Sequence, residues 1–211
     1  MESATISVIF VMGVAGCGKS TVMEHLHQKL SDELLSAPVA SIEGDKLHPQ
    51  ANIDKMARGI PLTDDDRWPW LAEIRSDVAK QGLQLLREHS GASTARVLVT
   101  CSSLKRAYRA FLADESTYRS TIASLTSIAT PSRVASVSVT FAFLNTPREV
   151  LEHRISSRPG HFMKAGMLES QMNTLEVPTS EEGVEGGYKV LNVDASQPLD
   201  AIVEQIAHGK T

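Results

Sequence analysis

Five apolar runs recur along the chain, and segments with helical spacing of apolar residues separate them. The runs predict strands at Ile6–Met12, Val39–Ile42, Val97–Thr100, Val137–Leu144 and Tyr188–Val193. Strands that alternate with helices form a parallel sheet covered on both faces. The pattern therefore predicts an α/β fold, with a five-stranded parallel sheet flanked by helices in a single domain over residues 1–211.

Two segments between the strands differ in how clearly the spacing of their apolar residues predicts a helix. After PLTDDDR, Pro69 suits the first turn of a helix because proline has no N–H to leave unpaired. The apolar positions that follow fall on one helical face: Leu71, Ile74, Val78 and Leu85. By contrast, the Ser/Thr-rich stretch 114–136 has little periodicity, and we expect a mobile surface insertion there.

The segment between the first strand and the next helix carries a phosphate-binding pattern. Gly13, Gly18, Lys19 and Ser20 have the spacing GxxxxGKS. In this loop, backbone N–H groups wrap phosphates, the lysine reaches the β- and γ-phosphates, and the serine holds Mg²⁺. We therefore expect Mg²⁺ with ATP or GTP, and Ser20 as the metal ligand. The expected nucleotide-binding residues of the loop are Gly13, Val14, Ala15, Gly16, Cys17, Gly18, Lys19, Ser20 and Thr21.

Composition and charge narrow the class of partner. The 211 residues, 42% of them hydrophobic, are enough for the core of one domain. A net charge of −4 argues against a nucleic-acid partner, which needs a basic face. No segment approaches the length of an apolar membrane span, so we expect no membrane partner. Cys17 and Cys101 are typical of reduced thiols, which predicts a cytoplasmic location.

Phosphate loops occur in switch GTPases, in motor or recombination ATPases and in small-molecule kinases. The chain has no Asn-Lys-x-Asp guanine motif, and RVLVTCSSL ends in Cys and Ser where helicase-like ATPases carry an acidic pair. EGDKLHP instead sets Asp45 just past the second strand, where open α/β sheets bind ligands. A carboxylate there can accept a proton from an attacking hydroxyl or help to place Mg²⁺. These features favour a small-molecule kinase.

Four segments, in order across residues 11–176, carry a closer likeness: GVAGCGKST, GDKLHPQANIDKMARGIPLTDDDRWPWL, CSSLKRAYR and RPGHFMKAGMLESQMNTLE. Together they resemble gluconokinases, a branch of the shikimate-kinase-like P-loop kinases. The resemblance implies a P-loop kinase fold with a substrate-binding helical excursion at about 48–90 and a lid at about 157–166. It implies direct phosphoryl transfer from ATP to the 6-hydroxyl of D-gluconate, which gives 6-phospho-D-gluconate for the pentose phosphate pathway. It also allows a homodimer.

An acceptor such as gluconate is a polyhydroxy carboxylate, so its pocket needs cations and short polar groups. The expected acceptor-site residues are Asp45, His48, Arg58, Arg67, Lys105, Arg109 and His161. Each cation has an alternative as part of a solvated helix face, Asp45 as a helix cap, and His48 as the start of a helix. Trp68 and Trp70 are expected to pack rather than to bind ligand.

The segment HRISSRPGHF supplies a second group of cations. Arg154 and Arg158 are four residues apart and so lie on one helical face, and PGH after them suits a turn. The resemblance implies a lid whose arginines face the transferring phosphoryl group, where positive charge stabilises the transition state. We expect Arg154 and Arg158 to bind nucleotide, and Lys19, Asp45 and Arg158 to be catalytic; the alternative for the arginines is a basic helix end.

Two other functions stay open at this point. One is a kinase for shikimate or another small sugar acid. The other is a nucleotide-binding module without turnover, against which the intact Lys19, Ser20 and Asp45 argue. Whether ADP release depends on an acceptor, and on which one, distinguishes these functions.

Overall fold

A computed structural model describes residues 3–33, 37–126, 134–156 and 165–209 of the chain. Five parallel strands form one sheet in the order β2-β3-β1-β4-β5. Their bounds are Ala4–Met12 for β1, Val39–Glu43 for β2, Thr94–Thr100 for β3, Val134–Asn145 for β4 and Lys189–Asp194 for β5. The predicted five-stranded parallel sheet is confirmed, and most strands extend a few residues beyond their apolar runs.

The end of the central strand β1 marks the edge of the sheet where a ligand is expected to bind. Val8 pairs with Val97 of β3 on one side and with Val139 of β4 on the other. The chain runs from β1 to β2 and β3 before it crosses to β4 and β5, so the strand order reverses at the end of β1. Open α/β sheets bind ligands at such a point, next to the carboxyl ends of the strands.

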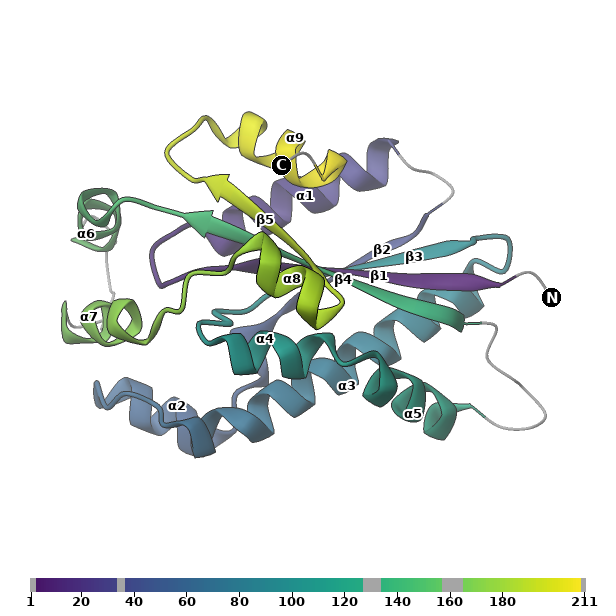
Figure 1. The fold of residues 1–211 in the computed structure, drawn as a ribbon, viewed down its shortest axis with the longest axis horizontal. Coiled ribbons are helices and arrows are strands. Elements are labelled where there is room, and N and C mark those ends of the chain that lie inside the picture. The colour runs from purple at the N-terminus through teal and green to yellow at the C-terminus, as the bar shows by residue number, and fades with distance from the viewer. Residues whose placement is uncertain (1–2, 34–36, 127–133, 157–164, 210–211) are drawn as a thin grey trace.

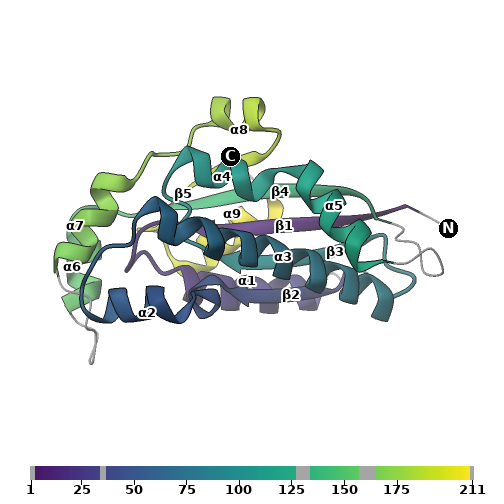
Figure 2. The same ribbon diagram turned by 90° about the horizontal axis from the view of Figure 1, so that it is seen from below.

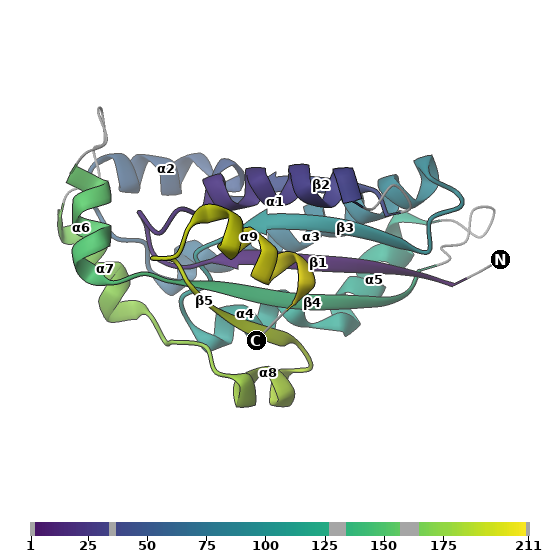
Figure 3. The same ribbon diagram turned by 90° about the horizontal axis from the view of Figure 1, so that it is seen from above.

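Helices cover both faces of the sheet. On one face lie α1 (Lys19–Glu33) and α9 (Leu199–His208), and on the other lie α3 (Asp64–Glu88), α4 (Arg106–Ala113) and α5 (Glu115–Leu125), as Figures 2 and 3 show from opposite sides. Each face has its own apolar core. The first includes Val11, Leu26, Leu98, Leu144 and Val203, and the second includes Phe10, Ile74, Tyr108, Tyr118 and Phe141.

Three further helices gather where the strands end. They are α2 (Gln50–Ala57), α6 (Arg148–Ser156) and α7 (Ala165–Thr174), and all lie at the end of the sheet toward which the strand arrows point (Figure 1). A short 3-10 helix, Gly44–Leu47, connects β2 to α2, and α8 (Ser180–Gly186) packs beside β5. The loop after β1 is therefore enclosed by elements from distant parts of the chain.

The expected start of α3 at Pro69 is wrong. The helix begins at Asp64 after Thr63, whose hydroxyl accepts a hydrogen bond from the N–H of Asp66, while the Asp66 carboxylate accepts one from the N–H of Thr63. This reciprocal capping box satisfies the first turn earlier, and Pro69 lies inside the helix. The additional turn matters because it carries Asp64 and Arg67.

The expected helical excursion at 48–90 is narrower in the structure. From Leu71 onward α3 is a layer of the core, since Leu71, Ile74 and Val78 are buried against the sheet. Of residues 48–90, α2 and the first turns of α3 lie toward the end of the sheet where α6 and α7 also lie (Figure 2). Helical spacing of apolar residues shows that one face of a helix is buried, but not which element covers it. Here the covering element is the central sheet.

The expected surface insertion at 114–136 is wrong for residues 115–125. Residues 115–125 form α5, with Asp114 as its N-cap, and Tyr118 and Ile122 are buried in the core. Residues 127–133 lie outside the described part, and β4 begins at Val134. Two apolar residues four positions apart were enough to bury one face of the helix, a signal hidden by the polar residues around them.

Candidate active site

The loop after β1 has the backbone shape of a phosphate-binding loop. Gly13, Gly16 and Gly18 have φ values of +141°, +84° and +101°, a region that side chains disfavour. A Cβ on Gly16 would also lie 2.9 Å from Ile155 of α6, so the loop and α6 are packed closely. In the described part of the chain, the N–H groups of Gly16, Gly18, Lys19 and Ser20 have no hydrogen-bond partner, so they can donate to phosphate oxygens.

Two side chains of this loop lie as phosphate and metal chemistry requires. The Lys19 ammonium folds over the loop and donates to the carbonyls of Gly13 and Val14 at 3.0 and 3.1 Å. The Ser20 hydroxyl donates to Oε2 of Glu43 at 3.2 Å. Glu43 ends β2 and also accepts a hydrogen bond of 2.8 Å from Thr100 at the end of β3. Hydroxyl and carboxylate oxygens are the donors that Mg²⁺ prefers.

Glu43 was missed by the sequence reasoning, although a signal was present. It directly follows the predicted strand Val39–Ile42, two residues before Asp45. Two acidic residues thus follow that strand, and the prediction named only the second of them. Pairing of β2 with β3, which sets Glu43 opposite Thr100, is what turns its carboxylate to Ser20.

Asp45 is exposed at the start of the turn that follows β2. Its carboxylate forms no hydrogen bond or ion pair with another described residue, and α2 has Pro49 as its N-cap, so Asp45 caps no helix there. The preceding Gly44 is required by packing, because a Cβ would lie 2.2 Å from the carbonyl oxygen of Thr100. Trp70 donates its indole N–H to the Gly44 carbonyl at 2.7 Å and fixes this turn.

His48 is buried and held in one orientation. Its ring stacks on Trp70 with a centroid distance of 4.1 Å, and its Nδ1 lies 3.3 Å from Nδ2 of Asn52. The same Asn52 nitrogen donates to the Asp66 carbonyl, so it is a donor to His48 as well, and the proton of the neutral ring is on Nε2. Burial lowers the pKa of His48, Asp45 opposes this shift and Arg67 adds to it. His48 is thus a neutral N–H donor beside Asp45.

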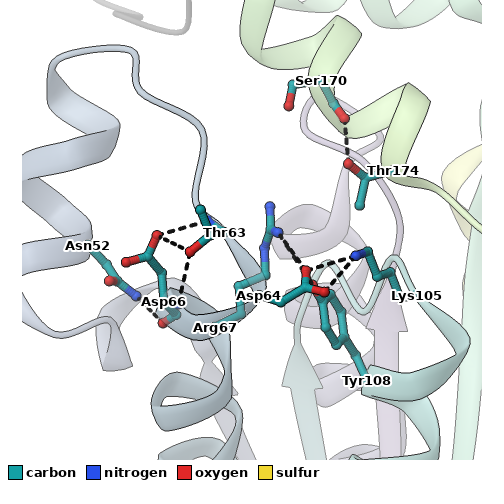
Figure 4. Close-up of polar contacts among 9 residues, drawn as sticks. All are labelled: Asn52, Thr63, Asp64, Asp66, Arg67, Lys105, Tyr108, Ser170 and Thr174. Carbon is teal, nitrogen blue, oxygen red and sulfur yellow. Dashed lines mark hydrogen bonds and ion pairs between the residues drawn. The ribbon is translucent and has the colours of Figure 1, made fainter.

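A mixed cluster of charges lies between α3 and α4 (Figure 4). The Lys105 ammonium donates to both carboxylate oxygens of Asp64 at 2.8 Å, and Nη1 of Arg67 lies 3.8 Å from Oδ1 of Asp64. The Tyr108 hydroxyl donates to Asp64 and accepts a 3.4 Å hydrogen bond from Arg67. The structure therefore brings together the predicted residues Arg67 and Lys105, around an acidic residue that the prediction omitted.

Arg58 and Arg109 do not join this cluster. Arg58 is exposed at the end of α2 and donates to its own helix, at the carbonyl of Asp54. Arg109 is fully buried and forms two hydrogen bonds of 2.6 and 2.7 Å with Glu182 of α8. It also donates to the carbonyls of Ser103 and Leu104, so its side chain fixes the loop before Lys105 and is turned away from solvent. These two arginines are therefore not placed to bind an acceptor together with Arg67 and Lys105.

Helices α6 and α7 both contact the phosphate loop. Arg154 of α6 donates to the carbonyl of Cys17 at 3.1 Å and to that of Ala195, just after β5, at 3.2 Å. Gln171 of α7 accepts a 2.7 Å hydrogen bond from the N–H of Ala15, a contact the sequence reasoning did not find. Arg158, His161 and most of the expected lid at 157–166 lie outside the described residues.

Comparison with known proteins identifies the relatives of this chain. A family profile described as an AAA domain matches residues 8–178. A probable gluconokinase of Schizosaccharomyces pombe is 39% identical over 83% of this chain and 75% of its own length. The thermoresistant gluconokinase of Escherichia coli is 34% identical over 96% of this chain and 95% of its own length. The chain belongs to the gluconokinase family.

The solved structure of a gluconokinase from Sinorhizobium meliloti 1021 supports the same assignment. It is 35% identical, with a TM-score of 0.63, over 98% of this chain and 90% of its own. Membership of the gluconokinase family confirms the expected P-loop kinase fold and an ATP-dependent phosphotransferase with an alcohol acceptor. It sets aside the switch-GTPase and motor-ATPase alternatives. Within the described residues, no helix has both the length and the apolar character to cross a membrane.

Proposed function

We propose that this protein is a gluconokinase that transfers the γ-phosphoryl group of ATP to the 6-hydroxyl of D-gluconate. The observation that carries the proposal is a set of polar groups past the strand ends that links an acidic residue to a cation cluster. Asp45 and Arg67 both act on the charge of His48, and Arg67 and Lys105 both lie beside Asp64. Lys19 belongs to the phosphate loop after β1, at the same edge of the sheet. These groups fit an acceptor with a hydroxyl at one end and a carboxylate at the other.

Each residue has a role in this reaction. The loop amides and Lys19 bind the phosphates, and Asp45 orients or deprotonates the attacking hydroxyl. His48 donates its Nε2–H to an acceptor oxygen, while Arg67 and Lys105 bind the carboxylate. Arg154 braces the loop where nucleotide binds. Arg158 and His161 remain predicted lid contacts to nucleotide and acceptor.

The oxygen donors at Ser20 and Glu43 fit Mg²⁺. Their 3.2 Å separation, with Ser20 exposed and Glu43 half-buried, allows both to reach one ion, directly or through water. When bound, Mg²⁺ neutralises phosphate charge. We also infer a cytoplasmic location, supported by the free thiols of Cys17 and Cys101. A homodimer is compatible with the family likeness.

The proposal is tested by coupled ADP release with ATP or GTP against a panel of acceptors. D-gluconate should be the preferred acceptor over shikimate and other sugar acids, and phosphorus NMR should identify the 6-phosphate. Lys19→Met serves as the inactive control, and Lys80→Met, on an exposed site of α3, as the matched one. ADP release that is independent of acceptor, or faster with another acid, would refute the proposal.

A further inference from the structure

Asp64 is the centre of the cluster between α3 and α4, and it is open to solvent. Three donors surround its carboxylate, namely Lys105 at 2.8 Å from each oxygen, the Tyr108 hydroxyl, and Arg67 at 3.8 Å. Its side chain is 46% exposed, whereas that of Arg67 is 12% exposed and Tyr108 is buried. A ligand entering the cluster would therefore meet the carboxylate as well as the cations.

The carboxylate of Asp64 is charged under ordinary conditions. The hydrogen bond from Lys105, and then that from Tyr108, lower the pKa of Asp64 below its usual value. The same hydrogen bond, which Lys105 donates to Asp64, raises the pKa of Lys105. Two cations and one carboxylate then leave the cluster with a single net positive charge.

Among the described residues, four other acidic side chains lie near the cluster without contacting it. Asp45 lies beside His48, on whose charge both it and Arg67 act, and Glu176 accepts a hydrogen bond from the N–H of Arg106. Asp66 faces away and accepts hydrogen bonds from Lys55 at 2.5 Å and from Thr63. Asp65, in the same turn, is exposed and forms no hydrogen bond or ion pair with another described residue.

Ser170 and Thr174 of α7, both uncharged, lie on the other side of Lys105 from Tyr108 in Figure 4. Asp64 is therefore the carboxylate in direct contact with Arg67 and Lys105, and it reduces the positive charge that an acceptor meets at these two cations.

We propose that Asp64 is a specificity-determining residue of the acceptor site, which limits the site to one net positive charge and so matches it to acceptors with a single carboxylate. The proposal rests on the proposed function, because it takes the Lys105 cluster as the site of the acceptor carboxylate. Without Asp64, two uncompensated cations would favour anions more strongly. The Asp64 carboxylate thus lowers the preference of the acceptor site for anionic acceptors, and its hydrogen bonds also hold Lys105 in place.

The test compares two acceptors that differ only in charge at one end. D-gluconate carries a carboxylate and D-gluconamide a neutral amide, and both keep the 6-hydroxyl. The measured quantity is the ratio of their kcat/KM values. Asp64→Asn should raise the ratio in favour of gluconate by roughly threefold to fivefold, the size expected for a partly exposed charge. Asp64→Glu, which keeps the charge, should leave the ratio at the parental value.

Asp65→Asn is the matched control, because it removes the same charge from the same turn without touching the cluster. It should leave the ratio and both kcat/KM values unchanged. If Asp64 only stabilises the helix or Lys105, Asp64→Asn will lower both values in proportion or reduce the ratio, and either result overturns the proposal. Failure of the parent enzyme to phosphorylate gluconate at all would instead refute the proposed function.

Discussion

The carboxamide oxygen of Gln171 accepts a 2.7 Å hydrogen bond from the backbone N–H of Ala15, in the middle of the phosphate loop. Gln171 is on α7, and the chain just past that helix contacts the acceptor side. The N–H of Glu176 donates to the carbonyl of Leu104 at 2.8 Å, and its carboxylate accepts from the N–H of Arg106 at 2.7 Å. Helix α7 therefore connects the phosphate loop to the segment that carries Lys105.

Gln171→Ala should lower kcat by about fivefold, because one hydrogen bond that positions the phosphate loop is lost. Asn173→Ala, at an exposed position of the same helix, should have no effect. Steady-state kinetics with ATP and gluconate, together with a thermal melt, measure both variants. Equal kcat in the two variants would show that the contact to Ala15 has no part in turnover.

Asp45→Asn should keep nucleotide affinity but reduce transfer to gluconate by roughly 10² to 10⁴, the contribution of a positioned acid or base. Asparagine has nearly the same size but neither the charge nor the proton affinity. Single-turnover rates and nucleotide titration by calorimetry distinguish the two properties. Asp65→Asn is again the control, and parental turnover in a folded Asp45→Asn protein would remove Asp45 from the mechanism.

Glu43→Gln should raise the Mg²⁺ concentration needed for half-maximal rate, because a carboxylate near Ser20 is replaced by a neutral amide. A chelator should abolish transfer in the parent, and added Mg²⁺ should restore it. The neighbouring Ser41→Ala, on the exposed side of β2, should leave the Mg²⁺ dependence unchanged. An identical Mg²⁺ titration in parent and Glu43→Gln would contradict the assignment.

His48 predicts an acid-dependent loss of stability. Burial lowers the pKa of His48 in the folded protein below the unfolded value of 6.5, so the unfolded chain binds more protons between these two values. The contribution of the neutral His48 ring to the unfolding free energy should therefore be fully present above pH 6.5. It should be lost as the pH falls from 6.5 to the lower pKa of the folded protein. His48→Gln should lessen the fall in melting temperature between pH 7.5 and 5.5, whereas the exposed His25→Gln should not. An unchanged fall in His48→Gln would argue against a buried neutral ring.

The buried pair of Arg109 and Glu182 predicts a large loss of stability. Burial opposes ionisation of Glu182, but hydrogen bonds from Arg109 and Tyr188 hold the pKa of its carboxyl below its ordinary value. Glu182→Gln leaves the buried guanidinium without its counter-charge and should lower the unfolding free energy by about 3 kcal/mol or more. Glu185→Gln breaks the exposed pair with Arg106 between the same two helices and should change the urea midpoint little. Similar midpoints for the two variants would contradict this role.

Interactions between residues close together in the sequence were enough to predict the strands of the sheet and the phosphate loop. The β-branched run Ile6–Met12 and the glycines after it act over a few residues, through strand packing and backbone conformation. Asp45 could be placed because parallel strands end at one edge, whatever their order. The start of α3 was missed although its signal was local. Its capping box has Asp66 where Glu is usual, and Pro69 gave a stronger indication of a helix start further along the chain.

Only the tertiary structure decided the partners of the charged side chains. Lys105 and Arg109 stand four residues apart in the same segment, yet one pairs with the solvent-open Asp64 and the other is buried against Glu182. Gln171 reaches Ala15 across 156 residues of sequence. A backbone conformation is set by neighbouring residues, whereas the environment of a long polar side chain is set by whichever helices pack against it, and that depends on the whole fold.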